Sequence, residues 1–299
     1  MAKNLTTLFL FKQYADLETT VNDDKKIVRL IDHVGQAIAA YCNRTFELTT
    51  YREWYDGTGT PRLTLNQFPV TRLLGASSDT VNVGSITNTS AKWASVTLRS
   101  AVLYLDAISS AGAETNDSVN ISDNATIGDL ETSVDALGNG WSMTVESGKS
   151  TEASVLLRPF DGVWTVSPDD VDLDIADQTD AVRLVEGSNQ QIEYPSLYHF
   201  PQGSQNVFVW YKAGYTLPVD NTGHTDLTTA GNVPDDLTLI ANEIVSAVFN
   251  ASGEEFAGAA SERIGNYSYT LGSGAQAMIQ SAIKEHGMAL STHRSSRVV

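Results

Sequence analysis

The residues with the clearest chemical potential in this chain of 299 residues are three carboxylates in alternate positions, Asp170, Asp172 and Asp174. Because single apolar residues separate them, an extended strand would place all three carboxylates on one face. Such a face could bind Ca²⁺, but the run lacks the glycine at the sixth position and the glutamate at the twelfth that an EF-hand loop uses. The pattern therefore favours an exposed strand face, and we predict no bound metal.

Other arrangements with catalytic potential are absent from the sequence. It contains no Gly-x-Ser-x-Gly, His-Glu-x-x-His or Walker pattern. The five histidines lack the spacing of metal ligands and stand at His33, His199, His224, His286 and His293. The single cysteine, Cys42, follows an apolar stripe and is predicted to be a small buried residue rather than a reactive thiol. We therefore predict that the protein is not an enzyme and needs no cofactor.

The element expected to organise the chain is a helix over residues 23–44. Apolar residues recur there at steps of three and four and would form one buried stripe, consisting of Ile27, Leu30, Ile31, Val34, Ala37, Ile38 and Tyr41. Asn22 or Asp23 can cap the first turn. The expected end of the helix is poorly signalled, because Arg44 leads into a β-rich run without a glycine.

Further elements are expected on both sides of a long middle segment. Before the middle segment we expect a short first helix at 5–17, a β-hairpin of 51–57 with 62–65, and a strand at 68–74. After it we expect a strand at 206–211 and two helices at 234–250 and 275–283. The apolar patch at residues 8–11 is too short for a signal-peptide core, and no run approaches the roughly 18 apolar residues of a membrane span. We therefore expect a chain that is intracellular when made and has no membrane partner.

The middle of the chain differs in composition from its flanks. Residues 76–200 contain 19 Asp and Glu against 5 Lys and Arg, and so hold most of the total net charge of -17. They are also rich in Ser, Thr, Asn, Gly and Val, which indicates boundaries near Gly75 and Pro201. Surplus carboxylates are typical of a solvated surface, and we expect this segment to point outward.

Many short β patterns between turn residues predict a sandwich- or barrel-like module in this segment. The strands are expected at 94–108, 118–121, 141–146, 153–157, 163–166 and 182–185. Residues 127–137 could instead form a short helix, because their apolar residues have helical spacing. The predicted fold class is therefore α+β, with a small helical bundle and a few strands in residues 1–75 and 201–299, interrupted by an inserted all-β, sandwich-like domain at 76–200.

Several short segments carry a family resemblance through their order along the chain. They are Tyr41-Cys-Asn-Arg-Thr-Phe, Tyr51-Arg-Glu-Trp-Tyr-Asp-Gly, Leu63-Thr-Leu, Phe68-Pro-Val, Asn206-Val-Phe-Val-Trp-Tyr-Lys-Ala-Gly-Tyr, Val233-Pro-Asp-Asp-Leu and Ile264-Gly-Asn-Tyr-Ser-Tyr-Thr. In this order they resemble the head-to-tail connector proteins of tailed bacteriophages, also called adaptor or head-completion proteins. The resemblance covers residues 1–75 and 201–299, and residues 76–200 depart from it as a long insertion.

The resemblance implies a structural virion protein of the neck, made in the host cytoplasm. Such proteins form a homo-oligomeric ring, commonly a dodecamer, between the portal protein and the next neck or tail protein, and DNA passes through the ring. In such proteins the C-terminal region docks onto the portal, which makes Lys284, His293, Arg294 and Arg297 candidate portal contacts. A solvated terminus is the alternative for these residues. The acidic chain suits a conduit, because basic contacts to phosphates would retard DNA.

The aromatic residues divide into two predicted groups. Tyr267 and Tyr269, in a glycine-flanked stretch, are candidate subunit contacts, because aromatic anchors dominate interfaces. Trp54 and Trp210 are predicted to lie in the core. An alternative function remains, in which the chain is a tail or surface protein whose β-rich module binds carbohydrate or a host receptor.

Overall fold

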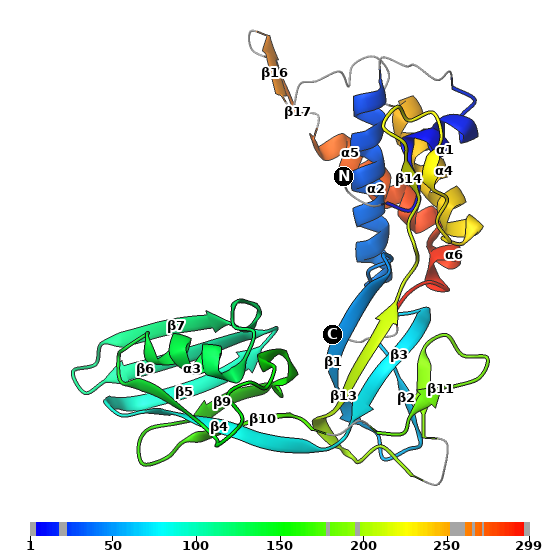
Figure 1. The fold of residues 1–299 in the computed structure, drawn as a ribbon. Helices are drawn as coiled ribbons and strands as arrows, with labels where there is room; N and C mark the ends of the chain where they lie inside the picture. Colours follow the sequence, from blue (N-terminus) through cyan, green and yellow to red (C-terminus); the bar gives the residue numbers. More distant parts are fainter. Residues whose placement is uncertain are drawn as a thin grey trace. The chain divides into compact units, whose positions relative to one another are not determined.

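The computed structural model describes residues 4–17, 23–177, 180–194, 198–251, 261–264, 267–270 and 272–295 (Figure 1). It is 28% helix and 37% strand, which confirms the α+β class. The chain divides into two compact units. Unit 1 comprises Met1–Thr50, Leu65–Arg72 and Lys212–Val299, and unit 2 comprises Tyr51–Thr64 and Leu73–Tyr211. Residues 51–64 and 201–211 thus group with the inserted segment, while the predicted domain at 76–200 stays a prediction.

Unit 1 is built on helices. They are α1 (Leu8–Tyr14), α2 (Asp24–Cys42), α4 (Asp235–Ala251), α5 (Gly272–Glu285) and α6 (Gly287–Ser291). Helix α2 contacts each of the other four, so the predicted organising role of this helix within unit 1 is confirmed. Its buried stripe, Ile27, Leu30, Ile31, Val34 and Ile38, shares a core cluster with the apolar face of α4, which includes Leu237, Ile244, Val245 and Val248.

The ends of α2 differ from the prediction. Asp23 is the N-cap residue, but its side chain makes no capping hydrogen bond. At the other end Asn43 adopts a left-handed conformation with φ of 49°, and its N–H donates to the carbonyls of Ala39 and Ala40. Asparagine tolerates this conformation better than most residues, so it ends the helix where the sequence offers no glycine.

Unit 1 also contains two short antiparallel pairs. Strand β14 (Val219–Asp220) pairs with β15 (Leu227–Thr229), and β16 (Ser261–Ile264) pairs with β17 (Tyr267–Thr270). The chain passes from one unit to the other within three strands, which are β1 (Thr49–Gly57), β3 (Val70–Ser77) and β13 (Gly203–Ala213). They form one sheet in the order β1-β13-β3.

The predicted hairpin of residues 51–57 with 62–65 is wrong. Strand β2 (Arg62–Thr64) pairs with β12 (Gln191–Glu193), which continues to β11 (Arg183–Leu184), while β1 lies beside β13. The β2 and β12 pairing places the buried side chains of Leu63 and Ile192 opposite each other. Cross-strand contacts of this kind outweigh the local Asp-Gly turn signal.

The inserted segment contains two antiparallel sheets. One has the order β10-β4-β8 and the other β7-β6-β5-β9. Their strands are β4 (Thr80–Asn88), β5 (Ala91–Arg99), β6 (Val102–Ser109), β7 (Glu114–Asn120), β8 (Trp141–Val145), β9 (Phe160–Trp164) and β10 (Val171–Ala176). Their apolar side chains share one core cluster.

The segment is not all-β, because it also contains helix α3 (Ile127–Asp135), and the alternative prediction for residues 127–137 is thereby confirmed. Thr126 and Asp129 form a capping box at its start, and Ile127, Leu130 and Val134 are buried. The strand expected at 153–157 is also wrong, because Ser154–Leu156 form a short 3₁₀ turn.

The two tryptophans predicted in the core have different environments. Trp54 is half-buried in unit 2, where its ring lies 5.3 Å from that of Phe208 and its Nε1 donates to the Leu157 carbonyl at 3.1 Å. Trp210 is 37% exposed, and the guanidinium of Arg52 lies 4.8 Å from its ring. The prediction for Trp210 is wrong because it lies on the more exposed face of β13, opposite the buried Val209 and Tyr211.

Candidate functional site

The candidate site begins where α2 ends. After the left-handed Asn43, the backbone N–H of Arg44 donates to the Ala39 carbonyl at 3.2 Å, and the chain turns toward Phe46. The turn carries the Arg44 side chain into unit 1, where only 5% of the residue is exposed. A buried arginine needs hydrogen-bond acceptors and π-surfaces around its guanidinium.

The guanidinium of Arg44 has both kinds of partner. It donates hydrogen bonds to the backbone carbonyls of Phe68 and, at 3.4 Å, His293. It also lies over three aromatic rings, 3.8 Å from the centroid of Phe68, 4.7 Å from Phe46 and 5.8 Å from Tyr215. We call Arg44, Phe46, Phe68 and Tyr215 the Arg44 cluster. Cation–π contacts are stronger in such a desolvated position than at a surface.

Backbone hydrogen bonds hold the segments of the Arg44 cluster together. The N–H of Tyr215 donates to the Phe46 carbonyl at 2.7 Å, and the N–H of Gly214 donates to the Pro69 carbonyl at 3.0 Å. Gly214 has φ of 108°, and a Cβ there would lie 2.5 Å from the carbonyl oxygen of Glu47. Only glycine therefore fits this position of the Ala-Gly-Tyr sequence.

Residues 286–295, called here the C-terminal segment, complete the site. Leu290 is fully buried, and its carbonyl lies 3.7 Å from the Sγ of Cys42. The backbone N–H of Ser295 donates to the Cys42 carbonyl at 2.9 Å, and its hydroxyl donates to the Asn66 carbonyl at 3.2 Å. The described C-terminal residues are thus packed against the end of α2.

The predicted portal contacts are not brought together by the described structure. Lys284 is exposed in the last turn of α5. His293 is mostly buried, and its Nε2 lies 2.7 Å from the Oδ2 of Asp236 in α4. Arg294 is exposed, with its guanidinium 5.8 Å from the ring of Tyr41. Arg297 lies outside the described residues. The four residues stay predictions as portal contacts.

The predicted subunit contacts lie on strand β17. The backbone of Tyr267 pairs with Ile264 and that of Tyr269 with Glu262. The two tyrosines are two positions apart in this strand. Their side chains lie outside what the structure describes, so their contact role stays a prediction.

Two groups in unit 1 have displaced pKa values with clear causes. Burial raises the pKa of the Cys42 thiol to about 11, despite the opposing charges of Arg44 and Arg294, and keeps the thiol protonated. Burial also acts to raise the pKa of Asp236. However, the hydrogen bond and charge of His293 and the backbone N–H of Leu237 outweigh this, so the pKa lies below its usual value. Burial therefore favours the neutral thiol of Cys42, whereas the contact with His293 favours the ionised carboxylate of Asp236.

The pair of Asp236 and His293 predicts a pH-dependent stability. A carboxyl whose folded pKa is depressed stabilises the fold above its unfolded pKa of about 3.9 and loses this contribution as the pH falls through the folded pKa. The side chain of Asp236 is 54% exposed, so solvent screening limits the effect. We expect Asp236→Asn to lower the unfolding free energy by at most about 1 kcal/mol near pH 6 and to have no effect near pH 2.

Urea denaturation of the wild type and Asp236→Asn at both pH values measures this. Asp235→Asn, in the same helical turn, is the matched control. If the unfolding free energies of the wild type and Asp236→Asn differ by the same amount near pH 2 as near pH 6, the ionised carboxylate does not have the assigned role.

The three carboxylates considered as possible Ca²⁺ ligands lie in and next to β10, with Asp172 and Asp174 in the strand and Asp170 just before it. Val171, Leu173 and Ile175 are buried and Asp172 is exposed, as expected. Asp174 is half-buried, however, and the pairing with β4 shifts register between Leu173 and Asp174, so the expected exposed face holds only in part. Among the described residues, no group of three or more His, Cys, Asp or Glu side chains is placed to bind a metal ion. Asp170, Asp172 and Asp174 are therefore assigned no ligand.

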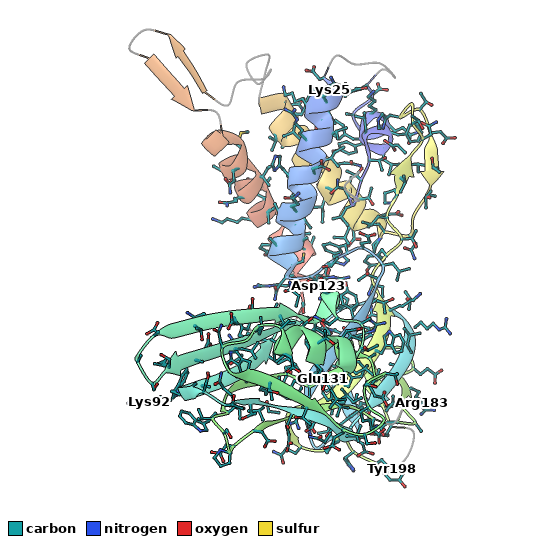
Figure 2. All side chains as sticks on the ribbon, turned by 60° about the vertical axis from the view of Figure 1, so that its left-hand side comes forward. Lys25, Lys92, Asp123, Glu131, Arg183 and Tyr198 are labelled. Carbon is teal, nitrogen blue, oxygen red and sulfur yellow. The ribbon has the colours of Figure 1, made fainter. Side chains whose placement is uncertain are left out.

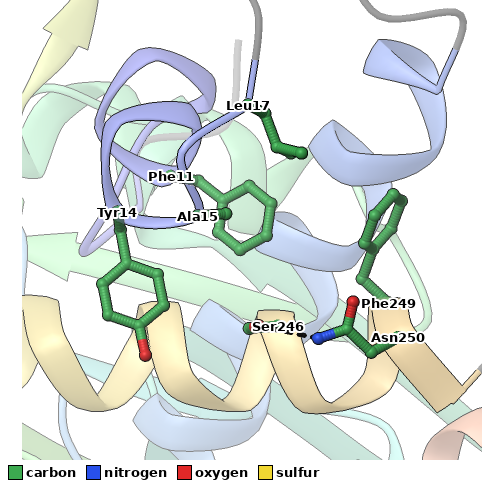
Figure 3. Close-up of a pocket in the computed structure, with 7 residues that line it drawn as sticks. All are labelled: Phe11, Tyr14, Ala15, Leu17, Ser246, Phe249 and Asn250. Atoms are coloured by element: carbon green, nitrogen blue, oxygen red, sulfur yellow. Dashed lines mark hydrogen bonds between the residues drawn. The ribbon is translucent and has the colours of Figure 1, made fainter.

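A separate cavity of about 370 Å³ lies between α1 and the end of α4 (Figure 3). Its lining consists of Phe11, Tyr14, Ala15, Leu17, Ser246, Phe249 and Asn250. The Nδ2 of Asn250 donates to the hydroxyl of Ser246 at 3.2 Å. The lining has no charged side chain and is mostly apolar and aromatic.

Comparison with known protein families, curated proteins and solved structures found no match. No helix in the described ranges is long and apolar enough to cross a membrane. The residues that sequence reasoning missed are those of the Arg44 cluster. The available signal was an arginine placed between the end of an amphipathic helix and an aromatic residue, Phe46, but its other partners are remote in sequence.

Proposed function

We propose that the protein is a structural head-to-tail connector of a tailed bacteriophage, which forms a ring below the portal and lets DNA pass. The observation that carries the proposal is the ordered series of sequence segments that resemble those of such proteins. Structural support comes from the Arg44 cluster, because several of those segments meet there. The segments around Arg44, Phe68 and Tyr215 contact one another although they are far apart in the chain.

The proposal assigns different roles to the parts of the chain. The helices of unit 1 would be the connector core, as a small bundle joined to a few strands. The segment of two sheets and α3 would be an inserted, sandwich-like module. The portal protein, the next neck or tail protein and further copies of the chain are the proposed partners, and the virion neck is the proposed location.

The mass of the purified chain in solution, alone and with portal particles, tests this proposal. Assembly into a closed ring, either alone or on the portal, is the expected result, because connector subunits must surround a channel. Light scattering coupled to size exclusion and electron microscopy of the mixture would measure it. A chain that stays monomeric and does not bind portal particles would refute the connector function.

The double substitution Tyr267→Ala and Tyr269→Ala is expected to weaken ring formation at least about tenfold in the concentration required. The physical reason is the loss of two aromatic anchors from strand β17. Tyr198→Ala is the matched control, because Tyr198 is 73% exposed in unit 2, where Figure 2 labels it. If the double variant and Tyr198→Ala form rings at the same protein concentration, Tyr267 and Tyr269 do not contribute to the contact between subunits.

A further inference from the structure

The inserted segment exposes three large aromatic side chains on one sheet. Trp93 on β5, Tyr104 on β6 and Trp164 on β9 are 40%, 43% and 43% exposed. The rings of Trp93 and Trp164 are 6.2 Å apart and nearly perpendicular. Folding normally buries side chains of this size, so their exposure on neighbouring strands indicates a surface that binds something.

The strand register places the three aromatic residues on the same face. Trp164 is paired with Ser95, which is two positions from Trp93, and Tyr104 is paired with Thr97. The alternate residues of β5, Ala94, Val96 and Leu98, are buried in the core of the segment. Trp93, Tyr104 and Trp164 therefore lie on the outer face of the sheet, which we call the aromatic face. In Figure 2, Lys92 marks the end of β5 that carries Trp93.

Polar side chains separate the aromatic rings on this face. Asp106 is paired with Ser95 on one side and with Asn116 on the other, and Ser118 is paired with Tyr104. These four polar residues therefore lie on the same face as the aromatic rings and between or beside them. Tyr104 lies on β6 opposite Thr97, which is four residues after Trp93 on β5. In standard strand geometry this separates the Cα atoms of Trp93 and Tyr104 by about 14 Å. The aromatic face is thus long enough for several units of a chain-like ligand.

We propose that the aromatic face binds a neutral polysaccharide chain. Pyranose rings present apolar C–H faces that pack on indole and phenol rings, and hydroxyls that hydrogen-bond to carboxylate, amide and hydroxyl groups between those rings. The surrounding residues 76–200 carry 19 acids against 5 bases, so they repel nucleic acid and acidic glycans.

A protein partner fits the face less well than a glycan. The centre of a protein interface is usually depleted of charged residues, whereas the carboxylate of Asp106 lies among the aromatic positions of this face. The glycan site is independent of the proposed connector function, because it uses none of the residues of unit 1.

Titration of the full chain with soluble neutral oligosaccharides of glucose, mannose, galactose and N-acetylglucosamine, followed by indole fluorescence and calorimetry, tests the proposal. We expect at least one of them to bind with a Kd of about 1 mM or tighter. Trp93→Ala and Trp164→Ala should each weaken that binding at least about tenfold. Trp210→Ala is the matched control, because it removes an exposed indole from a different sheet and should leave the affinity unchanged.

Circular dichroism checks that each variant is folded, and Trp93→Leu keeps an apolar side chain without the ring should the alanine variant be unstable. Trp93→Leu should also lose binding. Absence of binding by all four oligosaccharide classes overturns the proposal, as does binding that survives in both Trp93 and Trp164 variants. A wild-type dimer that these substitutions dissociate in sedimentation experiments also overturns it, since a second copy would then occupy the aromatic face.

Discussion

Replacing Arg44 by alanine is expected to lower the unfolding free energy of unit 1 by about 3 to 5 kcal/mol. The substitution leaves the buried carbonyl of Phe68 and the partly buried carbonyl of His293 without the donor that Arg44 supplies. It also removes the cation that packs over the rings of the Arg44 cluster and leaves a cavity between them. The unfolding free energy of Arg44→Lys should lie between those of the wild type and Arg44→Ala, because an ammonium group cannot reproduce the planar set of donors of a guanidinium.

Urea denaturation read out by labelling of Cys42 measures this loss specifically in unit 1, since Cys42 lies next to the cluster. Arg52→Ala in unit 2 is the matched control, and its loss of stability is read from tryptophan fluorescence, because all five tryptophans lie in unit 2. Arg52→Ala also removes an arginine stacked on an aromatic ring, but the ring of Trp210 is exposed. An exposed cation–π pair contributes about 0.5 to 1 kcal/mol. If Arg44→Ala and Arg52→Ala lower the unfolding free energy by the same amount, the buried contacts of Arg44 stabilise the fold no more than an exposed cation–π pair does.

Cys42 is expected to react with a thiol reagent at least about a thousandfold more slowly in the folded chain than in urea. Its side chain is fully buried, and burial raises its pKa to about 11. Near pH 8 a thiol with this pKa is only about 0.1% thiolate, whereas a free cysteine with pKa of about 8.5 is about one quarter thiolate. Labelling at native conditions therefore reports opening of the structure around Cys42.

The C-terminal segment should control this protection. Leu290→Ala leaves a cavity in the core cluster that also contains Cys42 and should accelerate labelling at least about tenfold, given a typical cost of about 2 to 5 kcal/mol for truncating a buried leucine. Leu239→Ala is the matched control, because Leu239 is 47% exposed on α4. Equal labelling rates in the two variants would show that the C-terminal segment does not shield the thiol.

The helices illustrate what local sequence determines. The stripe from Ile27 to Ile38 and the one from Leu237 to Val248 were predictable, because helical periodicity brings residues of one chain segment to one face. The capped helix from Ile127 was available as an alternative for the same reason. The burial of Cys42 followed from its place beside the stripe.

Strand pairing shows where local sequence is insufficient. The Asp-Gly turn after Tyr55 favoured a hairpin, but β2 pairs with β12, more than a hundred residues later. Alternation in β13 showed that Trp210 and Tyr211 lie on opposite faces, but not which face is buried. The partner sheet decides that, and it comes from a distant part of the chain.

By itself, the sequence determined the α+β class, the long helices and the β-rich character of the acidic middle segment, because composition and periodicity are properties of consecutive residues. The tertiary structure alone decided the Arg44 cluster and the aromatic face. Arg44 can be buried only where the carbonyls of Phe68 and His293 and the ring of Tyr215 converge on it. Similarly, Trp93 and Trp164 become neighbours only through the pairing of β5 with β9. Both arrangements depend on contacts between residues remote in sequence, which periodicity cannot encode.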